Sequence, residues 1–207
     1  TGLVVAAALA VGREIREGLV VAPKTHTRLG ASKASRWMAC PGSVRLEGQV
    51  PVPVSSSFAA EGTAAHALAE MCLRKHTRPT EFFGEKIEGF LVTDDMVEGV
   101  SVFTDYCQDL IEKSAQHWVE FPVDLAQLEP PEPMYGTADF ASYDAVAEEL
   151  EVVDLKFGRG VVVEAKDNEQ ARYYALGVAL ALAVGRTIKT VKSTIVQPRA
   201  GHVDGAI

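Results

Sequence analysis

An acid and an amine two residues apart in an apolar segment are the strongest constraint on how this chain folds. Asp154 and Lys156 lie in the otherwise mostly apolar residues 150–157. In an extended strand alternate side chains point to opposite faces, so Asp154 and Lys156 share one face while the apolar residues between them pack on the other. Asp139 provides a second acid on another expected strand, residues 134–143. Two carboxylates and a lysine on neighbouring strands are the groups that a metal-dependent phosphodiesterase needs.

The rest of the chain alternates between helical and extended patterns. Helical spacing and stop signals predict helices at residues 32–39, 61–75, 93–116 and 167–184. Extended patterns predict strands at residues 117–123, 134–143, 150–157 and 191–197, and residues 161–163 would extend or cap the sheet. The short polar segment between the second and third strands predicts a hairpin. We therefore expect an α/β fold.

Length and composition indicate one substantial core. The chain has 207 residues, of which 47% are hydrophobic, enough to bury one domain. We divide it into an N-terminal helix and linker, residues 1–31, and a main domain, residues 32–207, which we expect to be truncated if the chain is a fragment. The apolar run at residues 3–11 is about half of the roughly 20 residues that a membrane-spanning helix needs. We therefore expect no membrane anchor.

Cysteine spacing points to a reducing compartment. Cys40, Cys72 and Cys107 are widely spaced and odd in number, which argues against a disulfide framework and fits the cytoplasm. The sequence has neither a CxxC pair nor an HExxH motif. A structural zinc site and a histidine-zinc hydrolase are therefore disfavoured.

The charge balance argues against indiscriminate binding to nucleic acid. The net charge is −8, and binding to phosphates depends on clustered cations. A local basic groove remains compatible with this charge, and so does a scatter of solvated cations. Basic residues gather in two places, Arg28, Lys33 and Arg36 in one and Lys189, Lys192 and Arg199 in the other.

Several motifs, in order, resemble the RecB-like branch of the PD-(D/E)XK nuclease superfamily. They lie at residues 36–43 (RWMACPGS), 61–66 (EGTAAH), 136–139 (GTAD) and 154–156 (DLK), followed by Gln170 and Tyr174. The first two are similar to stretches shared by a phage protein family of that branch. The resemblance covers about residues 32–199 and implies a restriction-endonuclease-like core, with a mixed central β-sheet flanked by helices and N-terminal helical additions.

The resemblance implies a site for Mg²⁺ or Mn²⁺. His66 would bind the ion as a neutral imidazole, and Asp139 and Asp154 would provide hard oxygen ligands. The backbone carbonyl of Leu155 would add a ligand. From the residues alone other roles stay open: His66 could be hydrogen-bonded to Glu70 or exposed, and Asp139 could be a solvated carboxylate at a strand edge.

Two further residues would act beside the ion. The resemblance implies that Lys156 orients the attacking water and stabilises charge on the phosphate. The alternative is a solvated lysine in a surface ion pair with Asp154. Related nucleases often have an acid on the strand before the hairpin, so Glu120 is a candidate for supporting the site. Its alternative is an outward polar residue of an alternating strand.

Gln170 and Tyr174 lie four residues apart and so share one helix face. The resemblance implies that this pair contacts the DNA backbone or supports the metal site. Asp167 and Gln170 also fit a helix capping box, and Tyr174 could belong to the core.

Cys40 falls where some relatives have the first ligand of an iron–sulfur cluster. The three later cysteines of that pattern are absent, because Cys72 and Cys107 precede the expected catalytic strands. We therefore expect no iron–sulfur cluster in this chain and interpret Cys40 as a buried structural thiol.

The sequence thus predicts a divalent-metal-dependent deoxyribonuclease, more specifically an exonuclease of phage DNA recombination, repair or processing. Its catalytic residues would be Asp139, Asp154 and Lys156. Its partners would be DNA and phage recombination or single-strand-binding proteins, in the cytoplasm of the host cell. The alternative is a non-catalytic DNA-binding or assembly module that retains the nuclease fold, with which the negative charge is compatible.

Overall fold

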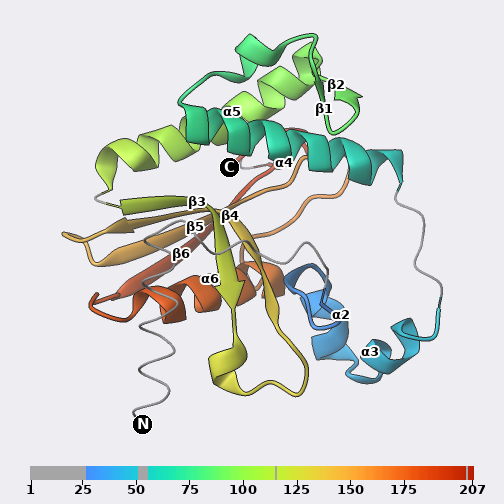
Figure 1. The fold of residues 1–207 in the computed structure, drawn as a ribbon, viewed down its shortest axis with the longest axis vertical. Helices are drawn as coiled ribbons and strands as arrows, with labels where there is room; N and C mark the ends of the chain where they lie inside the picture. The colour runs from blue at the N-terminus through green and yellow to red at the C-terminus, as the bar shows by residue number, and fades with distance from the viewer. Residues whose placement is uncertain (1–26, 51–55, 115, 204) are drawn as a thin grey trace.

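The computed structural model describes residues 27–50, 56–114, 116–203 and 205–207 (Figure 1). The helix expected within residues 1–31 lies outside these ranges. In the described part of the chain, no helix is both long enough and apolar enough to span a membrane.

A mixed four-stranded sheet forms the centre of the fold. Its strands are β3 (Gln116–Asp124), β4 (Tyr135–Asp144), β5 (Glu149–Leu155) and β6 (Thr190–Val196), in the spatial order β3-β4-β5-β6. Neighbours are antiparallel from β3 to β5, and β6 is parallel to β5. The chain reaches β6 through a helix, as a parallel connection requires. The predicted hairpin and the predicted mixed sheet are both confirmed.

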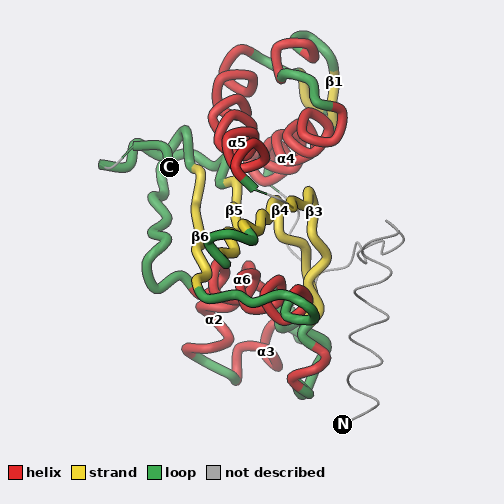
Figure 2. The backbone as a smooth tube through the Cα atoms, turned by 90° about the vertical axis from the view of Figure 1, so that its left-hand side faces the viewer, coloured by secondary structure: helices red, strands yellow, loops and turns green. Residues whose placement is uncertain are grey.

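Helices cover both faces of the sheet. The long helices α4 (Ser57–Lys75) and α5 (Asp94–Lys113) lie on one face, and α6 (Glu169–Leu182) lies on the other (Figures 1 and 2). The helical turn η1 (Ala31–Lys33) and α2 (Ala34–Ala39) pack against α6. The smaller elements are α3 (Gly42–Glu47), η2 (Pro79–Phe82), β1 (Lys86–Ile87), β2 (Phe90–Leu91) and η3 (Ala126–Leu128).

Side-chain caps begin the three long helices. Ser56 accepts a hydrogen bond from the backbone of Ala59 at 3.2 Å before α4, and Thr93 caps α5 in the same way. Asn168 accepts from the backbone of Ala171 at 2.9 Å and caps α6. Each cap satisfies a backbone donor that has no partner within its helix. The capping role predicted for Asp167 is therefore wrong, because Asn168 performs it.

Two apolar clusters fill the spaces between sheet and helices. Val153 and Leu155 pack with α4 and α5, whereas Leu150 and Val152 pack with α6. The predicted alternation along β5 is confirmed, with apolar residues on both faces. Both faces are buried because each is covered by helices.

Four boundary predictions need correction. The helix predicted at 61–75 begins at Ser57, and the one predicted at 93–116 ends at Lys113. The helix α3 follows Pro41 and was not among the predicted helices; the fixed φ of proline is compatible with the start of a helix. Residues 161–163 form a loop and do not extend the sheet.

Candidate functional site

The two acids Glu120 and Asp139 mark a break in the pleating of β3 and β4. Backbone pairing joins Val119 to Phe140 and Phe121 to Ala138 but skips Glu120 and Asp139. On either side of the break, Val119 and Phe140 pack on the α4 and α5 face of the sheet, whereas Phe121 and Ala138 pack on the α6 face. Residues two apart in a regular strand share a face. Both strands therefore change face at this point, and Glu120 has a left-handed backbone, with φ of 55°.

The carboxylate of Asp139 bridges from β4 to β5. The backbone pairing of these two strands ends at Phe140 and Val153. Beyond that point the backbone N–H of Leu155 donates to Asp139 Oδ2 at 2.7 Å. The side chain of Asp139 thus accepts a hydrogen bond where regular pairing has stopped, and this holds it beside the residues that follow Val153.

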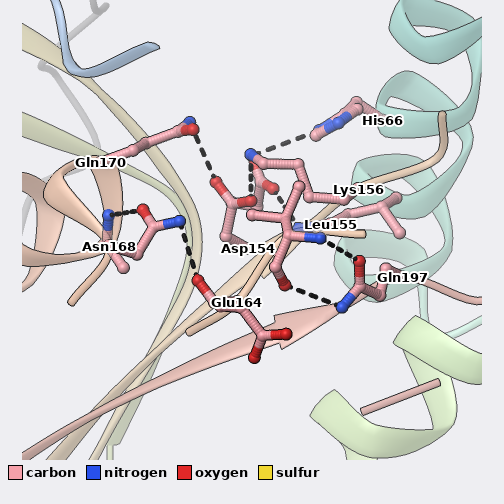
Figure 3. Close-up of polar contacts among 11 residues, drawn as sticks. His66, Asp154, Leu155, Lys156, Glu164, Asn168, Gln170 and Gln197 are labelled. Atoms are coloured by element: carbon pink, nitrogen blue, oxygen red, sulfur yellow. Dashed lines mark hydrogen bonds and ion pairs between the residues drawn. The ribbon is translucent and has the colours of Figure 1, made fainter. Parts of the chain in front are cut away.

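Asp154 lies between a lysine of its own strand and an amide from α6 (Figure 3). Lys156 forms an ion pair with Asp154 Oδ2, and Gln170 Nε2 donates to Asp154 Oδ1 at 3.3 Å. The Asp154 side chain is 10% exposed. The Asn168 cap fixes the first turn of α6, from which Gln170 reaches the sheet.

His66 reaches the same place from α4. Its Nδ1 lies 3.2 Å from Asp139 Oδ1. The alternative partner, Glu70, instead binds Arg74 at 2.8 Å. Arg74 also donates to the backbone oxygen of Val119 at 3.1 Å and so joins α4 to β3. The structure therefore gathers His66, Asp139, Asp154, Lys156 and Gln170 from four separate elements.

Burial and mutual charge shift the pKa values of this cluster. Burial and the charge of Asp139 raise the pKa of Asp154 to about 6, against the opposing effect of Lys156. Burial would raise the pKa of Asp139, but the charge and hydrogen bond of His66 hold it below its usual range. Burial lowers the pKa of His66, and Asp139 outweighs it, so that this pKa is about 9. Strong shifts of this kind are common at functional sites.

Glu120 is electrostatically coupled to the cluster. Burial and then the charges of Asp139 and Glu70 raise the pKa of Glu120 to about 7, with His66 and Arg74 acting in the opposite sense. Its left-handed conformation is uncommon for a residue with a side chain and costs about 1–3 kcal/mol. Glu120 is therefore a third carboxyl group beside the two strand acids.

Tyr174 packs directly on β4. A Cβ atom added to Gly136 would lie 3.2 Å from Tyr174 Cε1, so the absence of a side chain at Gly136 makes room for the ring. Tyr174 is partly buried and packs against the apolar cluster between the sheet and α6, here called the α6 cluster. This packing agrees with the alternative that Tyr174 belongs to the core. Burial and the charges of Asp154 and Asp139 raise the pKa of its hydroxyl, while a hydrogen bond with Gln170 lowers it. Gln170 and Tyr174 thus both adjoin the acids.

The donor set suits a hard divalent cation. Two carboxylates and an imidazole converge from Asp139, Asp154 and His66. Carboxylate oxygens are the ligands that suit Mg²⁺ or Mn²⁺, and the imidazole adds one nitrogen donor. The buried Oδ2 atom of Asp154 accepts no hydrogen bond of normal geometry from a described residue and lies against the Lys156 ammonium. In the described ranges no three Asp, Glu, His or Cys side chains already surround one point. Binding an ion therefore requires rotation of side chains that now pair with each other.

The sequence did not reveal how the loop between β5 and α6 is held. Gln197 accepts a hydrogen bond from the backbone N–H of Val163 at 2.9 Å and donates to its carbonyl at 2.8 Å (Figure 3). This buried amide fixes the loop that joins Lys156 to Gln170. A single glutamine at the end of a strand gives no sequence signal for such a role. Asn168, in contrast, could have been found as a helix cap from its position before an apolar run.

Side-chain exposure bears on two residues singled out in the sequence, Cys40 and Arg199. Cys40 is exposed, so its interpretation as a buried thiol is wrong, whereas Cys72 and Cys107 are buried. Cys40 is exposed because it follows the last turn of α2 and lies outside both apolar clusters. Arg199 is only 8% exposed and binds Glu61 and Asp95, with its guanidinium 4.2 Å from the ring centre of Phe157.

One family matches nearly the whole described domain. The family described as "Protein of unknown function (DUF2800)" matches residues 26–206. This range includes both strand acids and every element of the sheet. The chain belongs to the DUF2800 family.

Proposed function

We propose that this protein is a divalent-metal-dependent deoxyribonuclease with a restriction-endonuclease-like core of the RecB-like type. The observation that supports this most strongly is the pair of acids from two strands, Asp139 and Asp154, whose side chains are 15% and 10% exposed, with Lys156 and His66 beside them. Hydrolysis adds the oxygen of water to phosphorus and releases one DNA oxygen as a hydroxyl group. DNA ends in the cytoplasm of a phage-infected cell would be its substrate, alongside recombination or single-strand-binding proteins.

Asp139, Asp154 and His66 would hold Mg²⁺ or Mn²⁺, with the Leu155 carbonyl as a further ligand. When bound, the ion would polarise the phosphate and lower the pKa of the attacking water. The acids that would hold it are positioned by strands and by the hydrogen bond from Leu155 to Asp139. Rigid supporting elements favour accurate positioning of reacting groups.

Lys156 would stabilise negative charge that develops on the phosphate oxygens. It now pairs with Asp154, so binding of a cation by Asp154 would free the ammonium to turn toward the phosphate. Gln170 would orient Asp154 through its 3.3 Å hydrogen bond. Glu120 and Tyr174 would support the site, Glu120 through its charge and Tyr174 through packing on Gly136.

Incubation of the purified protein with end-labelled linear duplex and with closed circular duplex tests this proposal. We expect Mg²⁺- or Mn²⁺-dependent loss of the linear substrate, no cleavage in EDTA and little cleavage of closed circles. Cleavage of both substrates would support an endonuclease instead. Absence of cleavage with either ion and either substrate would contradict the proposal.

A second candidate is a non-catalytic DNA-binding or assembly module. It is favoured by the direct pairing of His66 with Asp139 and of Lys156 with Asp154, because these pairs compensate the buried acids without an ion. This candidate predicts DNA or partner binding that Asp154→Asn leaves unchanged, and no tight binding of Mn²⁺. Calorimetric titration with Mn²⁺ alone separates it from the nuclease.

A further inference from the structure

Several short segments of this acidic chain carry an excess of positive charge, and residues 27–48 form one of them. Residues 27–48 contain the four cations Arg28, Lys33, Arg36 and Arg45 and the single acid Glu47, a net charge of +3. The whole chain has a net charge of −8, so the remaining residues contribute −11. Clustered cations on an otherwise acidic protein favour a local site for polyanions, since like charges repel them elsewhere.

The cations of this segment lie on the turn before η1 and on η1, α2 and α3. Lys33 and Arg36 both bind the carboxylate of Glu47, the former at 2.8 Å. Arg28 donates to the backbone oxygen of Val44 at 2.9 Å and pairs with Glu132 at 2.9 Å. The side chains of Arg28, Lys33 and Arg36 are 52%, 45% and 64% exposed. Together with Trp37, Ser43, Val44 and Glu47 they line a shallow recess.

One carboxylate shared by two cations leaves positive charge in excess. Among the described residues, only two acids, Glu47 and Glu132, form ion pairs with these cations. Arg45 is exposed and forms no ion pair with a described residue. Glu47 also holds Lys33 and Arg36 close together before any ligand arrives. Such pre-organisation reduces the entropy lost on binding. We call Arg28, Lys33, Arg36 and Arg45 the basic surface.

The second group of cations is compensated by neighbouring acids. Lys189 pairs with Glu148, and Lys192 pairs with Glu149 at 2.6 Å. Arg199 is buried between Glu61 and Asp95. Each cation of this second group thus has an acid of its own, whereas the four cations of the basic surface share two acids.

The basic surface is attached to the helix that supports the candidate site. Trp37 donates from Nε1 to the backbone oxygen of Gly30 at 3.1 Å and packs against the α6 cluster. Ala31 is buried in the same cluster. Figure 1 places α2 beside the orange, N-terminal end of α6, where Gln170 reaches Asp154. A polyanion held by the basic surface would therefore lie near the two strand acids.

We propose that the basic surface binds the phosphate backbone of the DNA substrate beyond the cleavage point. The identification of this ligand as DNA rests on the proposed nuclease function. Exposed arginines suit phosphate because the planar guanidinium can donate two parallel hydrogen bonds to its oxygens. Contacts to phosphate alone give affinity without sequence preference. The basic surface thus supplies binding to DNA, and the strand acids supply the chemistry.

Fluorescence anisotropy with a labelled oligonucleotide tests the basic surface separately from cleavage. The full chain with Asp154→Asn is titrated in EDTA, so that cleavage does not enter. In that background Lys33→Ala/Arg36→Ala removes two cations of the basic surface. Lys189→Ala/Lys192→Ala removes the same charge elsewhere and is the matched control. Circular dichroism verifies that each variant folds.

We expect Lys33→Ala/Arg36→Ala to weaken binding about tenfold or more, and to reduce the slope of log K against log salt by about 1.4 to 1.8. The control pair should change the affinity less than about twofold, because each of its lysines is paired with an acid of its own and lies outside the basic surface. Equal effects of the two pairs, no effect of the first, or no DNA binding at all would overturn the proposal. Binding of anionic phosphatidylserine vesicles in place of DNA would also overturn it.

The two proposals fail in different ways. If the protein binds DNA through Lys33 and Arg36 but never cleaves it, the basic surface stands and the nuclease function falls. If the protein cleaves DNA with unchanged affinity in Lys33→Ala/Arg36→Ala, the nuclease function stands and the basic surface falls.

Discussion

The backbone N–H of Leu155 donates to the carboxylate of Asp139 at 2.7 Å and joins β5 to β4 where their regular pairing has ended. A buried N–H group needs a partner, and here a side chain replaces the missing carbonyl. Asp154 precedes Leu155, so the same hydrogen bond sets one acid relative to the other. The site is thus built into the end of the sheet.

Removing the charge of Asp154 should stabilise the metal-free protein at alkaline pH. Its folded pKa of about 6 exceeds its usual value of 3.8, so the ionised group disfavours folding above pH 6. This penalty is on the order of 3 kcal/mol and fades as the pH falls toward 4. We expect Asp154→Asn to raise Tm at about pH 8 by a few degrees, with a smaller gain at about pH 5. Thermal melts in EDTA measure both.

Asp144→Asn is the matched control for that experiment. Asp144 accepts backbone hydrogen bonds from Ala147 and Val146, which lower its pKa. Its charge therefore favours folding above its usual pKa, and its removal should lower Tm or leave it unchanged at the same pH. A lower Tm for Asp154→Asn than for wild type at alkaline pH would contradict the account of Asp154.

Binding of Mn²⁺ should release a proton from His66. The pKa of His66 is about 9, so the ring is protonated at neutral pH while it pairs with Asp139. A metal ligand must lose that proton, and affinity should rise about tenfold per pH unit below pH 9. Calorimetry in Hepes and Tris buffers should detect about one proton released per ion near pH 7.5. His66→Gln should abolish the release; a wild-type affinity independent of pH would exclude His66 as a ligand.

Truncating the amine of Lys156 should slow cleavage more than it weakens binding. Lys156→Met keeps much of the side-chain length but removes the ammonium that would stabilise the phosphate. We expect kcat to fall about 10²- to 10³-fold with little change in KM. Lys113→Met, at the exposed end of α5, should retain wild-type rates. An equal loss in both variants, or none in Lys156→Met, would remove Lys156 from the site.

The close contact of α6 with the sheet should make Gly177 intolerant of a side chain. A Cβ atom at Gly177 would collide with the buried Val123, whereas one at Gly62 in α4 would meet nothing within 4 Å. Alanine favours a helix by about 1 kcal/mol relative to glycine. Gly62→Ala should therefore be neutral or stabilising, and Gly177→Ala should destabilise by about 1–3 kcal/mol. Urea unfolding compares them, and equal stabilities would contradict the packing of α6.

Local patterns were sufficient to predict much of the fold. The alternation along β5 indicated which face holds Asp154, and the short polar segment indicated the hairpin with β4. These features depend on near neighbours in the sequence, so the pattern is visible there. Pro41 was read as the end of helical structure, although a proline is equally suited to precede a helix such as α3.

Long-range contacts were less accessible from the sequence. His66 has Glu70 four residues away on its own helix, but its partner is Asp139, which the sheet brings near. The left-handed conformation of Glu120 also lacks a local signal, because strand patterns predict an extended residue there. Tertiary packing determines both, and periodicity does not report it.

Single-turnover cleavage of an end-labelled linear duplex by wild type and Asp154→Asn, with Mn²⁺ and with EDTA, tests the central claim most directly. We expect product only for wild type with Mn²⁺, and a rate at least about 10²-fold lower for Asp154→Asn, even though that variant remains folded. Equal rates for the two proteins, or product formation by wild type in EDTA, would contradict a metal-dependent site built on Asp154.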